Sequence, residues 1–278
     1  MTSPATAPAQ CYRHPDRATR LSCSNCGRPI CIDCAIDTPV GQKCPECARP
    51  EGRHRVITAQ AIRQGGRRTA PVTFTIIGIC LSVFLLGELD PQLGFRLFDE
   101  GAQQADLIRA GEWWRPLTSM FLHAGLAHVG FNMWALYLFG PALERRYGSI
   151  PFAALYLASG LGGSALYHVI GRGNPAVGAS GAIFGLMGAL IVTLYRQRHD
   201  RIGRAIFSQL ILLLAINLAL PLVIPSIAWE AHVGGLVAGG GVAFAWDRLP
   251  ITGRAAIPRQ LSVALAVVAV AVGALLIG

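Results

Sequence analysis

A small set of polar side chains in otherwise apolar stretches could carry out acyl transfer. Ser180 lies in a Gly-x-Ser-Gly sequence at the head of a run that contains no charged residue. A serine hydroxyl becomes an effective nucleophile when an imidazole takes its proton, and His232 is a candidate for that general base. His128 and Asn132 could donate hydrogen bonds to the oxyanion that such an attack creates. Whether Ser180 reacts or only packs depends on whether the fold brings these four side chains together.

A second set of residues, near the N-terminus, has the spacing of metal ligands. Four pairs with a two-residue gap lie within fewer than 40 positions, and a two-residue gap lets both members bind one ion across a tight turn. The pairs are Cys11 with His14, Cys23 with Cys26, Cys31 with Cys34, and Cys44 with Cys47. Eight such ligands suit two tetrahedral Zn²⁺ ions with no position left for water.

A disulfide framework is the alternative interpretation of these cysteines. It is disfavoured because the pairs contain seven cysteines, an odd number, and because one pair includes a histidine. We therefore expect two structural zinc sites and no cofactor for catalysis. A segment this short has little hydrophobic core, so the metal should supply most of its folding free energy.

The composition indicates that most of the chain lies in lipid. Hydrophobic residues make up 53% of the sequence and charged residues only 14%, whereas about a quarter of a soluble domain is charged. Seven stretches without Asp, Glu, Lys or Arg are interpreted as transmembrane helices. They cover residues 69–87, 116–143, 147–171, 173–195, 205–229, 231–246 and 260–278. Ser180 then lies near the start of the fourth span.

The basic residues predict how these spans are oriented. Of the 24 Lys and Arg residues, 20 lie before the first span or after the second, fourth and sixth. Cytoplasmic loops carry such an excess, so the N-terminus is expected in the cytoplasm and the C-terminus outside. The net charge of +9 is explained by this distribution, and no nucleic-acid partner is expected.

This topology places the polar side chains at one depth. The second, fourth and sixth spans run inward, and His128, Ser180 and His232 all lie near their starts, roughly 10 Å below the outer surface. Glu230 is two residues from His232 and faces the other side of the helix, so the sequence predicts a Ser/His dyad without an acid. Glycines in the fourth and sixth spans would let the two helices approach closely.

Four motifs, taken together, resemble those of a rhomboid intramembrane serine protease. They are Gly-x-Ser180-Gly, His128-x3-Asn132, Ala-His232-x-Gly-Gly-Leu-x-x-Gly239, and Trp114-Arg115. The resemblance covers about residues 70–250, and the seventh span fits the family's "six plus one" form. It implies that Ser180 is the nucleophile and His232 the base, and that the Ser180 backbone N–H, His128 and Asn132 form the oxyanion site. Trp114 and Arg115 would be structural. Phe184 stands where some members have Tyr, and we expect it to stack on His232.

The N-terminal pairs resemble a B-box or RING-like zinc-binding domain. That resemblance implies cross-bracing, with the first and third pairs on one ion and the second and fourth on the other, although spacing alone leaves sequential pairing open. The expected organisation is a disordered lead at 1–10, a zinc-binding domain at 11–48, a basic linker at 49–70 and a transmembrane domain at 71–278. The fold class is thus an all-α polytopic membrane protein, a seven-transmembrane rhomboid-like helical bundle preceded by a small zinc-stabilised cytosolic domain.

The expected function is that of an intramembrane serine endopeptidase. It would cleave transmembrane or juxtamembrane segments near the outer membrane face through an acyl-enzyme, at small, helix-weakening residues. The alternative is a catalytically inactive rhomboid-like adaptor whose zinc module recruits a cytosolic partner. The Arg-rich, nearly Lys-free composition suggests a bacterial plasma membrane as the location.

Overall fold

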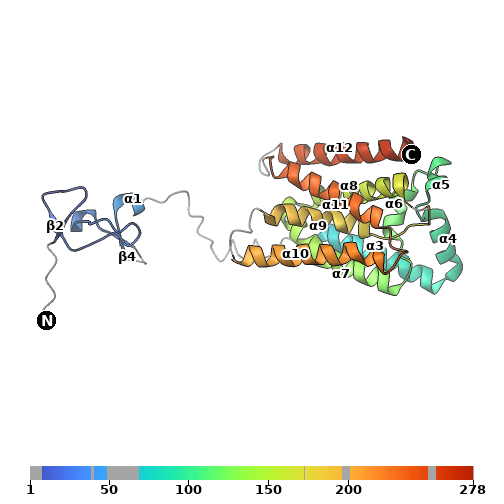
Figure 1. The fold of residues 1–278 in the computed structure, drawn as a ribbon, viewed down its shortest axis with the longest axis horizontal. Helices are drawn as coiled ribbons and strands as arrows, with labels where there is room; N and C mark the ends of the chain where they lie inside the picture. Colours follow the sequence, from blue (N-terminus) through green and yellow to red (C-terminus); the bar gives the residue numbers. More distant parts are fainter. Residues whose placement is uncertain are drawn as a thin grey trace. The chain divides into compact units, whose positions relative to one another are not determined.

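The chain divides into two compact units, one within residues 1–67 and one within 68–278. Figure 1 shows the fold in a computed structural model, which describes residues 8–38, 41–48, 69–171, 173–195, 201–249 and 255–277. The lead expected at 1–10 lies outside the described residues up to position 7, and the linker expected at 49–70 lies outside them up to position 68.

The first unit is built from short elements around its cysteines. Two antiparallel hairpins are joined by a 3₁₀ turn and followed by one helical turn. The elements are β1 (Ala9–Gln10), β2 (Ala18–Thr19), η1 (Ile32–Cys34), β3 (Ile36–Thr38), β4 (Gly41–Lys43) and α1 (Pro45–Ala48). Described structure therefore begins before Cys11. The buried core consists of five cysteines and Ile30, too little apolar surface to hold a fold by itself.

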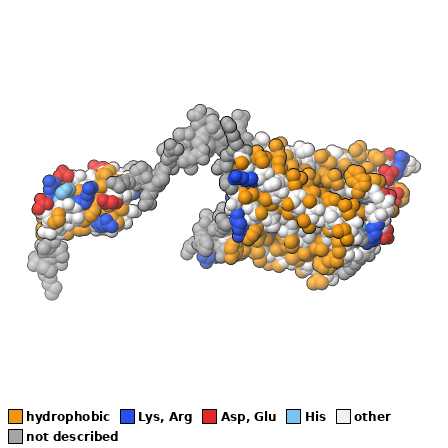
Figure 2. All heavy atoms as spheres, turned by 90° about the horizontal axis from the view of Figure 1, so that it is seen from above, with side chains coloured by type: hydrophobic (Ala, Val, Ile, Leu, Met, Phe, Trp, Pro, Cys, Tyr) orange, Lys and Arg blue, Asp and Glu red, His pale blue; other side chains and the backbone are white. Residues whose placement is uncertain are grey.

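The second unit is a bundle of long helices. These are α3 (Pro71–Leu89), α7 (Leu126–Tyr147), α8 (Ser149–Ile170), α9 (Ser180–Tyr195), α10 (Arg201–Ala219), α11 (Trp229–Trp246) and α12 (Ala256–Ile277). In the described part of the chain, α3, α8, α12 and the segment Gly203–Leu222 are long and apolar enough to cross a membrane, and α9 is apolar but shorter. The predicted all-α bundle of a multi-pass membrane protein is confirmed. On the face of this unit seen in Figure 2, hydrophobic side chains cover the middle and charged ones gather at the two ends.

Two of the expected spans begin well before their helices. The stretch from 116 forms α6 (Arg115–Thr118) and η2 (Ser119–Phe121) before α7 begins at Leu126. The stretch from 173 stays non-helical until Ser180, because Pro175 lacks an N–H and Gly178 has φ +128°, a left-handed conformation that ends regular geometry. The segment between the first two spans forms two short helices, α4 (Pro91–Gly101) and α5 (Ala105–Arg109).

Helices α8, α9 and α11 pack so closely that glycines form their contact surfaces. A Cβ on Gly188 would lie 2.6 Å from the Leu236 carbonyl oxygen, and one on Gly239 would lie 2.5 Å from the Gly185 Cα. A Cβ on Gly235 would overlap the carbonyl of Gly181, the residue after Ser180. Backbone therefore meets backbone where α9 and α11 cross, as the glycine spacing indicated.

We expect Gly239→Ala to destabilise the bundle by about 2 kcal/mol or more, because the added methyl overlaps backbone that cannot move aside cheaply. The shift would be measured as a lower midpoint of detergent-induced unfolding. Gly241→Ala is the matched control: it lies in the same helix, and a Cβ there meets nothing within 4 Å. Equal midpoints for the two variants would contradict the close packing.

A buried carboxylate caps the first long helix. Glu144 of α7 is 2% exposed and accepts the backbone N–H groups of Val72 and Thr73 at 3.0 and 2.9 Å. It also accepts the hydroxyls of Thr73 and Ser149, both at 2.7 Å. The free N–H groups of a helix N-terminus favour a negative charge, so Glu144 ties α3 to α7 and α8.

Glu144→Ala is expected to lower the free energy of unfolding by about 3 kcal/mol, because it leaves buried donors without an acceptor. Glu144→Gln should fall between this variant and the parent, since the amide keeps one acceptor oxygen but loses the charge. Detergent-unfolding midpoints of the three proteins check the order. If the alanine variant were as stable as the parent, the cap would contribute nothing.

Candidate active site

The fold brings Ser180 and His232 together at the starts of two adjacent helices. Ser180 is the first residue of α9, and His232 is the fourth of α11. Their Oγ and Nε2 atoms lie 2.9 Å apart. The ring of Phe184, one helical turn after Ser180, stacks on the His232 ring at 4.1 Å between centroids and 8° between planes. The imidazole is therefore held at the hydroxyl by packing, and Phe184 stacks as expected from its position.

The other ring nitrogen of His232 is buried and faces no hydrogen-bond partner in the described part of the chain. Among the described residues, nothing hydrogen-bonds the buried Nδ1, and no carboxylate contacts the ring. In the ranges that the structure describes, the contacts that orient this ring are the hydrogen bond with Ser180 and the stacking on Phe184.

His128 lies beside the turn that leads into Ser180. Its Nδ1 accepts the backbone N–H of Ala124 at 3.4 Å, so in the neutral ring Nε2 carries the proton and can donate. A Cβ on Gly178 would lie 2.7 Å from this Nε2, so only glycine fits at that position. The ring of His123 meets His128 edge to face at 5.1 Å.

Asn132 is placed differently from His128. It is buried in α7, and its side-chain amide donates to the His128 carbonyl at 3.0 Å. One of its two N–H groups is thus used within its own helix, which leaves the other to donate elsewhere. The His128 ring therefore lies next to the turn before Ser180, whereas the described hydrogen bond of Asn132 is to the His128 backbone.

The segment before Ser180 is held by the loop that precedes α7. Gln103 and Ala176 exchange two backbone hydrogen bonds of 2.9 Å, and the N–H of Gly178 donates to the Ser119 carbonyl at 2.9 Å. Arg115, almost fully buried, donates to the Asp99 and Ala102 carbonyls at 2.7 and 2.8 Å. These bonds fix the loop against which the Ser180 turn is built.

Arg115 and Trp114 therefore act on the backbone rather than on the site. The Arg115 guanidinium also pairs with Glu112, and the Trp114 indole N–H donates to the Glu100 carbonyl at 3.0 Å. All of these partners belong to the segment between α3 and α7. These contacts fit the structural role that the family resemblance implied for Trp114 and Arg115.

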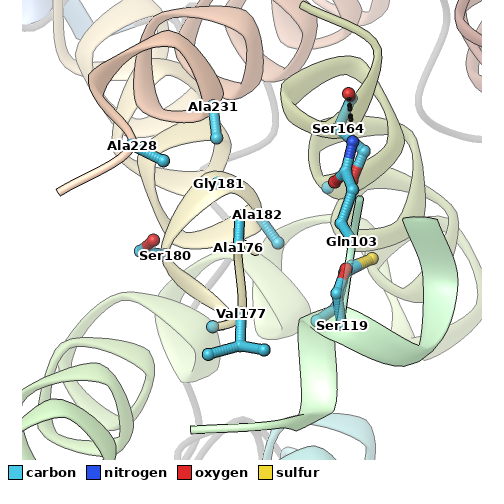
Figure 3. Close-up of a pocket in the computed structure, with 13 residues that line it drawn as sticks. Gln103, Ser119, Ser164, Ala176, Val177, Ser180, Gly181, Ala182, Ala228 and Ala231 are labelled. Atoms are coloured by element: carbon cyan, nitrogen blue, oxygen red, sulfur yellow. Dashed lines mark hydrogen bonds between the residues drawn. The ribbon is translucent and has the colours of Figure 1, made fainter. Parts of the chain in front are cut away.

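A pocket adjoins Ser180, and small residues line most of it (Figure 3). Ala228, Ala231 and Gly181 form one side, and Gln103, Ser119 and Ser164 the other. On that second side, the Gln103 side chain donates to the Ser164 carbonyl at 2.7 Å. The sequence alone does not point to Gln103 or Ser119, because an uncharged polar residue outside a long helix carries no periodic signal.

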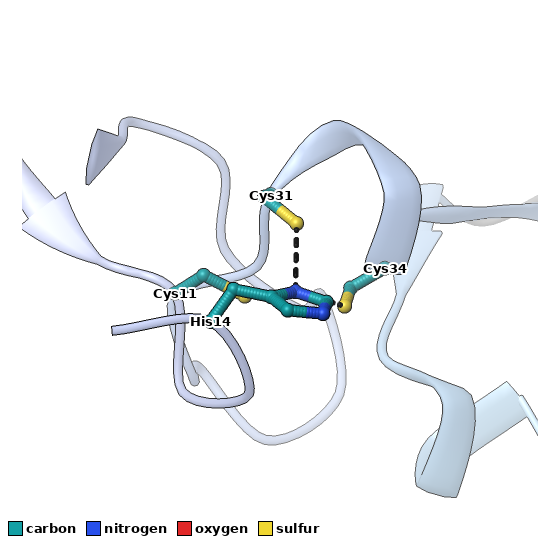
Figure 4. Close-up of side chains that lie close together, drawn as sticks. All are labelled: Cys11, His14, Cys31 and Cys34. Carbon is teal, nitrogen blue, oxygen red and sulfur yellow. Dashed lines mark hydrogen bonds between the residues drawn. The ribbon is translucent and has the colours of Figure 1, made fainter. Parts of the chain in front are cut away.

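The cysteine pairs of the first unit gather into two groups. Cys11, His14, Cys31 and Cys34 form one, drawn in Figure 4, and Cys23, Cys26, Cys44 and Cys47 form the other. Within each group all ligand atoms lie within 4.8 Å of one another. The structure thus combines the first pair with the third and the second with the fourth, which is the cross-braced arrangement.

The spacing of these atoms fits tetrahedral coordination of one metal ion in each group. Nδ1 of His14 lies 3.4 Å from the sulfurs of Cys31 and Cys34, and the sulfurs of Cys26 and Cys44 are 3.8 Å apart. Bonds of about 2.3 Å to sulfur and 2.0 Å to nitrogen give tetrahedral edges of about 3.5–3.8 Å. Nδ1 of His14 lies 3.9 Å from the Cys11 sulfur, so both groups can hold a metal ion with only small shifts of their ligand atoms.

The thiols differ in how readily they give up a proton. The backbone N–H of Cys44 stabilises the thiolate of Cys23 and lowers its pKa to about 6. Burial raises the pKa of the Cys34 thiol to about 11. A metal ion must displace the proton from such a thiol, so binding at the first group releases protons near neutral pH.

Comparisons with known proteins agree with the geometry. A family model described as the Rhomboid domain matches residues 110–248, half of the chain. Rhomboid protease GluP of Bacillus subtilis is 39% identical over 225 residues, which cover 80% of this chain and 43% of GluP. RHOMBOID-like protein 6, mitochondrial, of Arabidopsis thaliana is 38% identical over 144 residues, covering 50% of this chain and 45% of that protein. The chain thus spans less than half the length of these two relatives. Putative rhomboid protease YdcA of Bacillus subtilis is 40% identical over 139 residues, covering 49% of this chain and 69% of YdcA.

Proposed function

The chain belongs to the rhomboid family, and from that premise we propose that it is a serine endopeptidase acting on other membrane proteins within the bilayer. The observation that carries the proposal is the 2.9 Å approach of His232 Nε2 to Ser180 Oγ. A free serine in a transmembrane helix hydrogen-bonds a backbone carbonyl, as Ser159 does with Leu155 at 2.7 Å. Ser180 instead faces an imidazole beside an open pocket, which is the arrangement of an activated nucleophile.

In the proposed reaction, Ser180 Oγ attacks the scissile carbonyl while His232 Nε2 accepts its proton. The oxyanion that forms lies at the N-terminus of α9, where the Ser180 backbone N–H has no partner in its own helix. His128 Nε2 and the free N–H of Asn132 would add donors from α7. His232 then gives its proton to the leaving amine, and the acyl-enzyme is hydrolysed by a water that His232 deprotonates.

The same geometry supports a class of substrate. A helix hides its carbonyls in its own hydrogen bonds, so a scissile segment must first unwind. Gly and Ser at the cleavage point weaken a helix, and their small side chains suit a pocket lined largely by Ala, Gly and Ser. Substrates are therefore expected to be membrane proteins with small, helix-weakening residues in or next to a transmembrane segment.

The location of the site follows from the proposed orientation. The excess of basic residues favours a cytoplasmic N-terminus and a C-terminus outside, in a bacterial plasma membrane. Ser180 then lies toward the outer face, and the zinc module lies in the cytosol. The donor set of three cysteines with one histidine, and of four cysteines, favours Zn²⁺ in the two groups. A cytosolic partner of this module would regulate the enzyme or recruit its substrates.

Labelling with a fluorophosphonate probe tests the proposal. The parent should label at Ser180, and His232→Ala should reduce the labelling rate by about 10³-fold or more, because the hydroxyl loses its base. His168→Phe is the matched control, since His168 is another buried histidine and lies in α8. If neither the parent nor the control labelled, the catalytically inactive adaptor would be the better account.

A further inference from the structure

The segment that joins α10 to α11 exposes aliphatic side chains where a loop would ordinarily be polar. It consists of η3 (Leu220–Leu222) and residues 223–228. Leu222 and Val223 are 86% and 80% exposed, and Ile224 is 45% exposed. No Asp, Glu, Lys or Arg occurs from 205 to 229. The segment is called the apolar loop below.

The backbone of the apolar loop needs few hydrogen bonds from water. Pro221 and Pro225 have no N–H, and the N–H groups of Val223 and Ile224 both donate to the Leu220 carbonyl, at 2.9 and 2.8 Å. The N–H of Ile227 donates to the Ile224 carbonyl at 3.1 Å. Unpaired backbone groups are what normally exclude irregular chain from lipid, and here most donors are absent or satisfied.

The apolar loop also lies at the right level to meet lipid. Helix α10 begins at Arg201, and its 19 residues rise about 28 Å, so the apolar loop follows one bilayer thickness after the basic end. On one face of α10, Leu212 and Ile216 are exposed and are followed at the same four-residue spacing by the exposed Leu220. Trp229 follows the apolar loop and is 38% exposed, as is typical of a tryptophan in the headgroup region.

We propose that the apolar loop inserts into the membrane leaflet on the Ser180 side, with Leu222 and Val223 among the acyl chains. The occupant of its exposed surface is phospholipid, because the surface continues the lipid-facing side of α10 and carries no charge that a water-exposed loop or a polar partner would use. This contact lies outside the proposed catalytic residues.

The insertion matters for the site because the apolar loop runs directly into it. Ala228 lines the pocket beside Ser180, and its carbonyl accepts the backbone N–H of His232 at 3.4 Å. The leaflet therefore holds the chain that sets the start of α11, and with it the ring that faces Ser180. Lipid is in this sense a structural partner of the site.

Photocrosslinking in the full-length protein tests the insertion. p-Benzoylphenylalanine would replace Val223, and the protein would be irradiated in vesicles of phosphatidylcholine and phosphatidylglycerol. Intact mass spectrometry then counts phospholipid adducts. Two matched positions calibrate the yield: Val270 on the outer side of α12, 75% exposed, and Asp106 in α5, whose side chain is 96% exposed.

We expect the lipid adduct at position 223 to form with a yield close to that at 270 and several times that at 106. A yield no higher than at 106 would place the apolar loop in water, and crosslinks to a second copy of the chain would make that copy the occupant; either result overturns the proposal. The same measurement at Leu222 serves if the first variant does not fold. Because the readout is a lipid adduct, it stands or falls independently of peptide-bond cleavage.

Discussion

Replacing Ser180 by alanine should abolish cleavage of a membrane-protein substrate while leaving the bundle folded. The methyl group of alanine cannot attack a carbonyl, and a water molecule would not be positioned where the Ser180 hydroxyl lies. The cleavage rate should therefore fall on the order of 10⁴-fold or more. The variant should stay folded because the Ser180 side chain contacts only the His232 ring among the described hydrogen bonds. The measurement is cleavage of a reconstituted substrate in vesicles, followed by mass spectrometry of the products.

Two further variants separate chemistry from packing. Ser208→Ala removes an exposed hydroxyl from α10 and should cleave at the parent rate. The double variant Ser180→Ala with His232→Ala should be no slower than Ser180→Ala alone, because members of one catalytic unit are not additive. Full activity of Ser180→Ala would remove Ser180 from the reaction, whatever its distance to His232.

The sequence is enough to predict that Ser180 and His232 lie at the same membrane depth, because this depth follows from the positions and directions of the apolar spans. Composition marks the apolar stretches, and the distribution of basic residues sets their direction. The glycines then predict that α9 and α11 approach, as they do at Gly235 and Gly239. Each of these signals is local in sequence, so none requires knowledge of the tertiary fold.

What the sequence could not give was the exact geometry at the head of α9. The apolar run extends back to 173, yet the helix begins at Ser180, because the preceding turn is bonded to Gln103 and Ser119 from a distant segment. Hydropathy does not distinguish a helix from an extended apolar segment of this kind. The helix is consequently shorter, and Ser180 becomes its first residue with a free backbone N–H.

Glu144 is a second case in which the sequence does not reveal a contact between distant segments. In the sequence it reads as a charge that ends an apolar stretch, and such a charge would ordinarily be solvated. In the fold it is buried and caps α3, more than 70 positions earlier in the chain. Asn132 is a similar case, because its place in the site depends on a hydrogen bond within α7 that spacing allows but does not specify.

Loss of the metal should unfold the first unit and leave the second intact. The core of the first unit is made largely of the cysteines themselves, so without an ion their sulfurs have little else to hold them together. Structural zinc ions contribute on the order of 10 kcal/mol each, which exceeds what so small a core supplies. Cys31→Ser should therefore release at least one of two bound ions and make residues 8–48 sensitive to protease.

The eighth cysteine provides the control for this prediction. Cys80 is buried in α3, outside both groups, and Cys80→Ala should keep two metal ions per chain and the protease resistance of the parent. Metal content would be measured by elemental mass spectrometry of the full-length protein, and protease sensitivity by the masses of the fragments.

The cross-braced arrangement adds a sharper expectation. The ligand pairs of the two ions alternate along the chain, so losing the ion at Cys31 should loosen the segments that carry the second group. The second ion should then become easier to remove with a chelator. If Cys31→Ser kept both ions at full affinity, the two sites would be independent, and the metal would not hold the unit together.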